Sequence, residues 1–255
     1  MLRKKRFPNL PSLLKQTEMN NTLTNKVAYI TGGSKGIGFG IAQALLAKGM
    51  KVAISGRNLQ AVEEAAKQLN SPNVLALQSD VRSAESEAEA VRKTVEHFGS
   101  LDAVVANAGV GFFSPIDTLS EEDWKSTIDT NLTGVFNTVK AGIEPLKKSE
   151  GYIITIASLA GTNFFENGAA YNASKFGLVG FTQAIMLDLR KYGIKVSTIM
   201  PGSVSTYFNN HTPSEADAWK IQPEDIGELV VDLLQMNPRT LPSKIEVRPS
   251  KPGKG

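Results

Sequence analysis

Tyr171 and Lys175 lie four residues apart in the segment Tyr171-Asn-Ala-Ser-Lys175, and together they could transfer a proton. In a helix this spacing puts both side chains on one face, one turn apart. A free tyrosine has a pKa of about 10, and a fixed positive charge nearby lowers that pKa. Lowering it by about 3 units would take about 4 kcal/mol of differential stabilisation. A surface tyrosine packed against a lysine side chain would give the same pattern, so the meaning of the pair depends on the rest of the chain.

A glycine-rich segment, Thr31-Gly-Gly-Ser-Lys-Gly-Ile-Gly38, connects an apolar run to a helical pattern. Glycines allow a tight turn and a close approach of the backbone to a ligand, and the N–H groups at a helix start bind phosphate. A lone glycine loop is weak evidence, but a position between the first strand and the first helix is the context that dinucleotide binding requires. The glycine spacing is Thr-Gly-x-x-x-Gly-x-Gly rather than Gly-x-Gly-x-x-Gly.

Short apolar runs alternate with helical patterns along most of the chain. Continuous apolar strands that alternate with helices predict a parallel sheet covered on both faces, and right-handed crossovers make it doubly wound. We therefore expect an α/β fold, Rossmann-like, with about seven strands and helices on both faces. The expected strands are 27–30, 51–55, 74–78, 101–106, 152–157, 194–200 and 244–247, and the expected helices are 36–48, 59–69, 85–98, 121–146, 170–192 and 223–236.

Length and the lack of a sharp composition break favour one domain, which we assign to residues 25–255 and expect to bind a dinucleotide through its glycine loop. The chain has 255 residues, of which 41% are hydrophobic and 21% charged, as in ordinary globular proteins. Residues 1–24 are basic and then polar, and are expected to form a flexible extension or a loosely docked arm; Met19 could be the natural start. No apolar h-region marks a secretory signal, and a cytoplasmic location is expected.

The charge and cysteine content exclude several function classes. The net charge of +3 lies mostly at the two ends, so the body is close to neutral and nucleic-acid binding is not indicated. The chain has no cysteine, which excludes a disulfide framework and a catalytic thiol, and we expect no metal site. No apolar run has the length of a membrane span.

Further motifs follow in an order that resembles the short-chain dehydrogenase/reductase family. The resemblance covers about residues 26–247. Two positions depart from the common pattern, Ala106 and Ala157, and the usual glycine-rich end after the last strand is absent, which puts the oligomer contact and part of the substrate wall in doubt. Besides the glycine loop, the motifs are Asp80-Val81, Asn107-Ala-Gly109, Asn131, Ser158, Tyr171 with Lys175, and Pro201-Gly-Ser-Val-Ser-Thr206.

The resemblance implies four catalytic residues. Tyr171 would exchange a proton with the substrate oxygen, and Lys175 would lower the Tyr171 pKa and bind the nicotinamide ribose. Ser158 would donate a hydrogen bond to the developing alkoxide. Asn131 would hold a water that connects Lys175 to solvent.

The cofactor is expected to be NADP(H). The second strand ends in Ser55-Gly56-Arg57, without the acid that would bind the 2′-hydroxyl of NAD. The Arg57 guanidinium and the Lys35 ammonium suit a 2′-phosphate, although both could be solvated surface charges. Asp80 would contact the adenine or be only a turn acid, and Thr206 would bond the carboxamide or cap a helix. With Tyr171 and Lys175, the implied cofactor-binding residues are Gly32, Ser34, Lys35, Gly36, Ile37, Gly38, Arg57, Asp80, Val81, Asn107, Gly109, Pro201, Gly202, Val204 and Thr206.

Aromatic pairs in three loops predict an apolar wall for a bulky or hydrophobic carbonyl, although each could equally pack under a loop. We expect an NADPH-dependent carbonyl reductase or alcohol dehydrogenase that forms a homodimer or homotetramer. A 3-oxoacyl-acyl-carrier-protein reductase is the nearest rival, and a catalytically silent NADP-binding sensor is a third reading. The sequence pattern suggests no partner for His97 or His211, so neither histidine is assigned a role. The expected substrate-lining residues are Phe112, Phe113, Phe164, Phe165, Tyr207 and Phe208.

Overall fold

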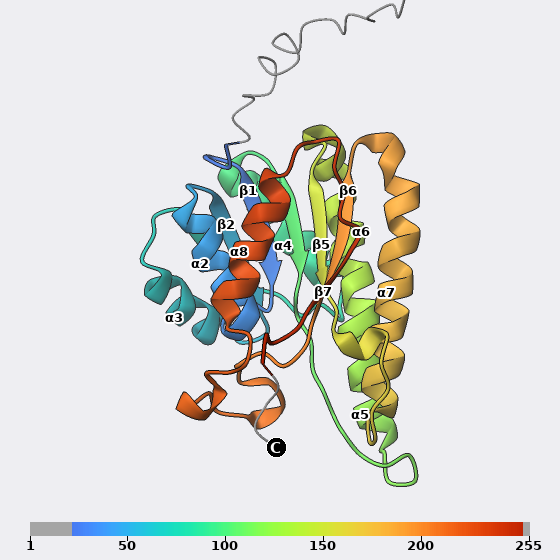
Figure 1. Cartoon of the computed structure of the whole chain (residues 1–255). Helices are drawn as coiled ribbons and strands as arrows, with labels where there is room; N and C mark the ends of the chain where they lie inside the picture. Colours follow the sequence, from blue (N-terminus) through green and yellow to red (C-terminus); the bar gives the residue numbers. More distant parts are fainter. Residues whose placement is uncertain (1–21, 252–255) are drawn as a thin grey trace, which may run out of the picture.

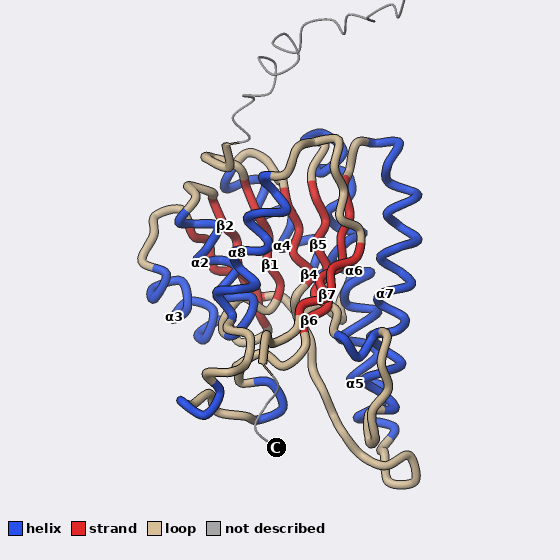
Figure 2. Tube along the Cα trace, in the orientation of Figure 1, coloured by secondary structure: helices blue, strands red, loops and turns tan. Residues whose placement is uncertain are grey.

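The structure, a computed structural model, describes residues 22–251 and contains one parallel sheet. Seven strands pair in the order β3-β2-β1-β4-β5-β6-β7, and every pair is parallel, as expected from the sequence (Figures 1 and 2). The strands are β1 Val27–Thr31, β2 Lys51–Gly56, β3 Val74–Gln78, β4 Ala103–Ala106, β5 Tyr152–Ile156, β6 Lys195–Pro201 and β7 Lys244–Val247.

Helices cover both faces of this sheet (Figure 1). One layer holds α2 Gly36–Ala47, α3 Leu59–Leu69 and α8 Pro223–Gln235. The other holds α4 Ala84–Phe98, α6 Gly134–Ser149 and α7 Ala169–Leu189, with α5 Glu121–Ile128 leading into α6. This is the predicted doubly wound arrangement.

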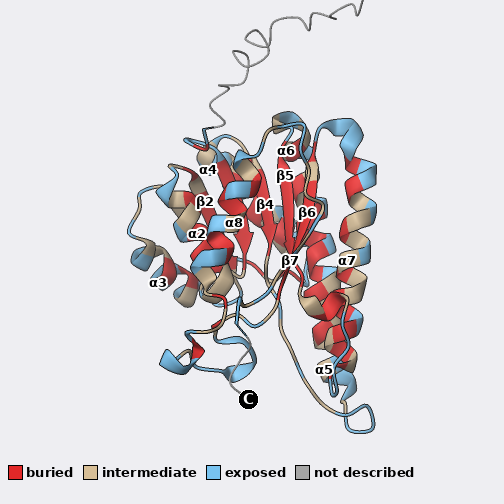
Figure 3. Cartoon of the chain, viewed as in Figure 1, coloured by how far each residue is buried: buried red, intermediate tan, exposed pale blue. Residues whose placement is uncertain are grey.

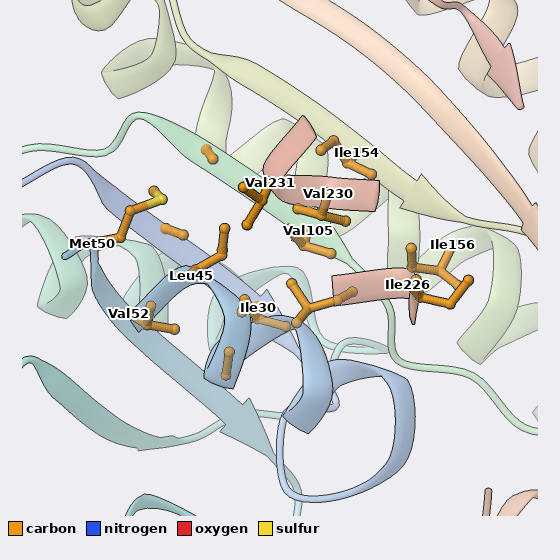
Figure 4. Close-up of a cluster of buried hydrophobic side chains, with 14 of the residues drawn as sticks. Ile30, Leu45, Met50, Val52, Val105, Ile154, Ile156, Ile226, Val230 and Val231 are labelled. Atoms are coloured by element: carbon orange, nitrogen blue, oxygen red, sulfur yellow. The ribbon is translucent and has the colours of Figure 1, made fainter. Parts of the chain in front are cut away.

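Alternation along β1 supplies both halves of the core. Ile30 packs with Leu45 of α2 and Val230 of α8 (Figure 4). Ala28 belongs to the same cluster, whereas Tyr29 faces the opposite helix layer. Figure 3 shows the central strands buried and the helices exposed on their outer sides, whereas the edge strands β3 and β7 are only partly buried. Successive strand residues point to opposite faces, so an apolar run of this length is buried only if both faces are covered.

The strand order reverses direction between β1 and β4, and this point positions the candidate site. The chain leaves β1 toward one helix layer and leaves β4 toward the other, so their carboxyl ends open a crevice at the sheet edge. Asn107 joins the two loops there. Its side-chain amide donates to Thr31 O at 2.9 Å and to Gly32 O at 3.1 Å, and its backbone N–H donates to Thr31 Oγ1 at 3.0 Å.

Most predicted elements agree with the structure to within a residue or two, and two do not. The helix expected over 170–192 ends as α7 at Leu189 and is followed by the 3-10 turn Arg190–Tyr192. The single helix expected over 121–146 is three pieces: α5, a π-helical turn η1 Asp129–Thr133, and α6. Leu23, which the sequence interpretation placed in the extension, is buried against the core. The remainder of that extension up to residue 21, including Met19, lies outside the described residues.

Candidate active site

Helix α7 carries Tyr171 in its first turn and Lys175 one turn later, so the two side chains share a face. Lys175 Nζ lies 5.6 Å from the centroid of the Tyr171 ring and donates to the backbone carbonyl of Ile156 at 3.1 Å. The Tyr171 hydroxyl is hydrogen-bonded to the side chain of Ser158. Ile156 is the last residue of β5 and Ser158 follows two residues later, so the end of this strand holds Tyr171 and Lys175 in place.

Burial controls the protonation state of both groups. It raises the pKa of Tyr171 to about 12, against a smaller lowering by the hydrogen bond to Ser158. It lowers the pKa of Lys175 to about 8, because a desolvated ammonium is costly. In the protein alone, desolvation is the largest influence on the Tyr171 pKa, and the expected lowering by Lys175 stays a prediction for the site with its cofactor bound. At neutral pH the phenol is protonated, and a charge that lowers its pKa in the occupied site would make it a stronger proton donor.

Ser158 bridges the ends of β5 and β6. It caps the short 3-10 helix η2 Leu159–Gly161, where its Oγ accepts from Ala160 N at 3.1 Å. The same oxygen lies 3.5 Å from Pro201 O. With Tyr171 beside it, this hydroxyl is fixed on the side of the crevice where a carbonyl oxygen would meet the phenol.

Asn131 lies in the π turn and is fully buried. Its Oδ1 accepts from Val110 N at 2.8 Å, while its Nδ2 donates to Val110 O at 2.9 Å and to Ser174 Oγ at 3.0 Å. A Cβ placed on Gly109 would lie 3.3 Å from Asn131 Oδ1 and 3.8 Å from Lys175 Nζ. The structure thus brings together three predicted site residues, Gly109, Asn131 and Lys175.

The glycine loop has the geometry of a phosphate cradle. Gly32 has φ +66°, and a Cβ there would lie 2.9 Å from Ala108 Cα. Gly36 has φ +57° and faces Thr206, whose Cγ2 would be 3.3 Å from an added Cβ. Helix α2 begins with no side-chain cap and no acid in its first turn, so its N–H groups are available to an anion. These residues fit the pyrophosphate of a dinucleotide.

The ends of β2 and β3 lie beside this loop. A Cβ on Gly56 would lie 3.9 Å from Ser34 Oγ, and the exposed Arg57 follows at once. Within residues 22–251 the Arg57 guanidinium makes no hydrogen bond or ion pair, whereas Asp80 forms an ion pair with Arg82. Val81 is buried, and its carbonyl accepts from Asn137 Nδ2 at 2.8 Å.

Comparison with known proteins identifies the family of this chain. The family model described as short chain dehydrogenase matches residues 26–217. The chain belongs to the short-chain dehydrogenase family. An uncharacterized oxidoreductase of Staphylococcus aureus is 35% identical over 228 residues, which cover 89% of this chain and 98% of the relative.

Two solved structures resemble the chain closely. The first is an alcohol dehydrogenase from Thermococcus sibiricus complexed with 5-hydroxy-NADP, with TM-score 0.83, 32% identity, and coverage of 88% of this chain and 97% of that one. The second is a 3-ketoacyl-(acyl-carrier-protein) reductase from Brucella melitensis complexed with NADH, with TM-score 0.82, 25% identity, and coverage of 89% and 98%. As a short-chain dehydrogenase, the chain is an oxidoreductase that acts on CH–OH or C=O groups with a nicotinamide cofactor.

Three of the six predicted aromatics of this short-chain dehydrogenase surround Tyr171. The centroids of Phe113, Phe208 and Phe165 lie 5.4, 5.6 and 6.4 Å from that of Tyr171. Phe164 instead stacks on Phe176 at 5.0 Å and is 82% exposed.

The other predicted aromatics lie farther out. Phe112 is 37% exposed, and Tyr207 lies under Lys35, whose Nζ is 5.6 Å from the ring centroid. That contact connects the glycine loop to the segment after β6. In this segment Val204 pairs with Ile221, and a Cβ on Gly202 would lie 3.1 Å from Leu159 Cδ1.

Two polar clusters of this short-chain dehydrogenase were not predicted from its sequence. His211, to which no partner was assigned, lies 2.6 Å from Asp217, which also bonds Lys220 at 2.5 Å. The pKa of Asp217 is held well below its ordinary range by Lys220 and then His211. The second cluster surrounds Glu87, a fully buried acid on α4. Its spacing from Ala90 and Val91 is the one signal that places it on the buried face of the helix.

Two possible features are absent from the described chain. Residues 22–251 hold no group of three or more histidine and acidic side chains arranged to bind a metal ion. In the same range, every helix is too short or too polar to span a lipid bilayer.

Proposed function

We propose that the chain is an NADPH-dependent carbonyl reductase or alcohol dehydrogenase that acts on a ketone, an aldehyde or a secondary alcohol. The observation that carries this proposal is the half-buried Tyr171, which is hydrogen-bonded to Ser158, one turn from Lys175, and at the same sheet edge as the glycine loop. A proton donor beside a dinucleotide cradle is what carbonyl reduction requires.

Each catalytic side chain has a separate task. The bound nicotinamide supplies the hydride chemistry. Tyr171 Oη gives its proton to the carbonyl oxygen in reduction and takes it back in oxidation. Ser158 Oγ donates to the same oxygen, where negative charge develops. Lys175 binds the nicotinamide ribose and brings its positive charge toward the phenol once the crevice is occupied.

Asn131 has a positioning task in this proposal. Its side-chain amide is already bonded to Val110 and Ser174. It therefore fixes the π turn and the backbone after Gly109 against Lys175. We propose that proton return from solvent to Lys175 passes along this turn, by way of a water that Asn131 helps to hold.

The choice of NADP(H) rests on Arg57 and Lys35. Arg57 follows Gly56 at the end of β2, where an NAD-binding site would place an acid, and its guanidinium is exposed. Lys35 precedes the phosphate-facing turn and is exposed as well. Each charge-assisted bond of about 1.5–3 kcal/mol would give a preference of about ten- to a hundredfold.

Initial rates with NADPH and NADH test this choice. Arg57→Ala should lose about tenfold or more of the NADPH preference, whereas Lys67→Ala, an exposed lysine at the far end of α3, should retain it. A wild-type preference for NADH, or an unchanged preference in Arg57→Ala, would refute the assignment.

The substrate is proposed to be hydrophobic. Phe113, Phe165 and Phe208 lie around the Tyr171 ring, so a carbonyl that reaches the phenol must pass apolar rings. A panel of aliphatic and aromatic ketones, aldehydes and alcohols should show turnover that rises with apolar size. Higher kcat/KM for 3-oxoacyl-carrier-protein thioesters would favour the rival reductase, and cofactor binding without any turnover would favour a silent sensor.

Self-association is proposed through the outer faces of α6 and α7. Ala173, Gly180, Ala184 and Leu187 form an exposed stripe along α7, and Leu187 is 62% exposed. Phe136 of α6 is 49% exposed beside Phe181. Apolar faces of this kind cover one another in oligomers, so a homodimer or homotetramer is expected. The cytoplasmic location expected from the sequence stays a prediction.

A further inference from the structure

Arg57 and Asp80 leave two neighbouring strands at the same edge. In the β2–β3 register Gly56 is opposite Gln78. Gln78 Nε2 donates to Arg57 O at 3.0 Å, and Ser79 N donates to Gly56 O at 3.0 Å. These bonds hold the backbone of Arg57 against the turn that carries Asp80. An anion bound by the Arg57 guanidinium would therefore lie close to the Asp80 carboxylate.

The Asp80 carboxylate is compensated by Arg82. Arg82 Nη2 donates to Oδ2 at 2.6 Å, Nε donates to Oδ1 at 3.0 Å and to Oδ2 at 3.1 Å, and the Arg82 backbone N–H donates to Oδ1 at 3.1 Å. The turn is also fixed from behind, where Asp80 N donates to Ser86 Oγ at 3.1 Å. The pKa of Asp80 is lowered chiefly by Arg82, and the charge of Arg57 acts in the same direction.

This arrangement leaves Arg57 free for another anion. Two arginines lie within electrostatic reach of Asp80, and only Arg82 is bonded to it. Without Arg82, the carboxylate would attract the Arg57 guanidinium and repel a phosphate that approaches it. Bidentate pairing suits arginine better than lysine, because the planar guanidinium matches a carboxylate.

We propose that Arg82 is a specificity-determining residue for the cofactor: by pairing with Asp80, it removes a negative charge from the 2′-phosphate position and reserves Arg57 for that phosphate. The inference rests on the proposed NADP(H) preference. It adds a residue that need not touch the cofactor. It also explains how an acid can stand next to a phosphate site.

A purely structural role for the Arg82–Asp80 pair makes a different prediction. If the pair only held the turn, its loss would loosen the part of the site that binds the adenine. The affinities for NADPH and NADH would then fall by the same factor. An electrostatic role affects only ligands that carry the 2′-phosphate. The ratio of the two dissociation constants therefore separates the two roles.

The experiment measures dissociation constants by calorimetry at low salt, for NADPH, NADH, 2′,5′-ADP and 5′-AMP. Arg82→Ala should raise the dissociation constants of NADPH and 2′,5′-ADP by about three- to tenfold. It should change those of NADH and 5′-AMP by less than about twofold. The double variant Arg82→Ala, Asp80→Asn should restore the ratio of the NADPH and NADH dissociation constants, because the unpaired carboxylate is gone. The loss in Arg82→Ala should shrink at high salt.

Two further variants keep the test decisive. Arg92→Ala removes an exposed arginine that pairs with Glu89 and Glu96 on α4, and should leave all four constants unchanged. Arg82→Lys keeps a positive charge and should retain most of the preference, so it reports on the charge if Arg82→Ala does not fold.

Two results would overturn the proposal: equal weakening of phosphorylated and unphosphorylated ligands in Arg82→Ala, or a double variant that fails to recover the ratio. A wild type that prefers NADH would refute the proposed cofactor as well. A wild type that prefers NADPH, with a ratio unmoved by Arg82→Ala, would refute only the role of Arg82.

Discussion

At the scale of single residues, Tyr171 and Lys175 are shaped more by burial than by each other. Burial raises the pKa of the phenol to about 12 and lowers that of the ammonium to about 8. Desolvation disfavours the charged form of each group, so near neutral pH the phenol keeps its proton and the lysine holds its charge at a cost in stability. Sites that hold such groups trade folding free energy for chemistry.

Replacing Lys175 by methionine should therefore abolish turnover and stabilise the fold. A folded-state pKa of about 8, against an ordinary 10.5, means that the unfolded chain binds more protons between these two pH values. Burying the charged Lys175 therefore lowers the free energy of unfolding by about 3 kcal/mol below pH 8, and this cost declines as the pH rises. In urea unfolding, the stability gain of Lys175→Met over wild type should fall by roughly 2–3 kcal/mol between pH 7 and pH 10.

Lys67→Met controls for the loss of one exposed lysine. A stability difference between Lys175→Met and wild type that is the same at both pH values would contradict the burial argument. The same result would arise if the ammonium reached solvent in the folded protein.

Residue identities at the site could be read from the sequence, but their charges could not. Motif order placed the glycine loop and Ser158 at strand ends, where an open α/β sheet binds ligands, and Tyr171 on the helix that follows Ser158. The protonation of Tyr171 depends on how deeply it lies among Phe113 and Phe208. Those contacts join segments far apart in the chain, and no local pattern encodes them.

At the scale of elements, Glu87 holds four segments together. Its carboxylate accepts from Tyr29 Oη at 3.0 Å, from Ser79 Oγ at 2.6 Å and from Thr138 Oγ1 at 2.7 Å. These partners come from β1, the end of β3, and α6, and Glu87 itself comes from α4. Burial raises the pKa of Glu87, and the hydroxyl donors oppose that rise. The network anchors Ser79, the residue before Asp80.

Glu87→Ala should destabilise the protein by about 2–4 kcal/mol, because three buried hydroxyl groups lose their acceptor and a cavity remains. Chemical denaturation at pH 7 measures the change. Glu63→Ala, an exposed acid on α3, is the matched control and should leave the midpoint nearly unchanged. An equally small effect in Glu87→Ala would mean that the hydroxyls find other acceptors.

The π turn marks the limit of prediction at this scale. Residues 121–146 read as one continuous helical stretch, and the π turn Asp129–Thr133 is itself helical and contains no proline or glycine that would mark a break. Both ends of the Asn131 amide bond the backbone of Val110, in the loop after β4, and these bonds hold the turn in place. Since that partner lies in another loop, the sequence of the helix alone could not reveal the turn.

At the scale of the whole molecule, the outer face of α7 is an apolar surface that a single chain leaves uncovered within the described residues. If two copies pair through this face, Leu187→Glu should shift the protein toward monomer in sedimentation velocity while its circular dichroism stays native, because a buried unpaired charge is costly. Leu59→Glu, on the exposed start of α3 in the other helix layer, should leave the oligomeric state unchanged. A Leu187→Glu protein that sediments as the wild type would place the interface elsewhere.

The proton-donor role of Tyr171 is the central claim, and Tyr171→Phe tests it most directly. With NADPH and the best ketone of the panel, kcat should fall by about 10²–10⁴-fold. The dissociation constant for NADPH should stay within about threefold of wild type, because the phenyl ring keeps its packing against Phe113. Tyr192→Phe makes the same chemical change beyond the other end of α7 and should keep full turnover. Tyr171→Phe with normal NADPH binding and kcat within about threefold of wild type would contradict the account.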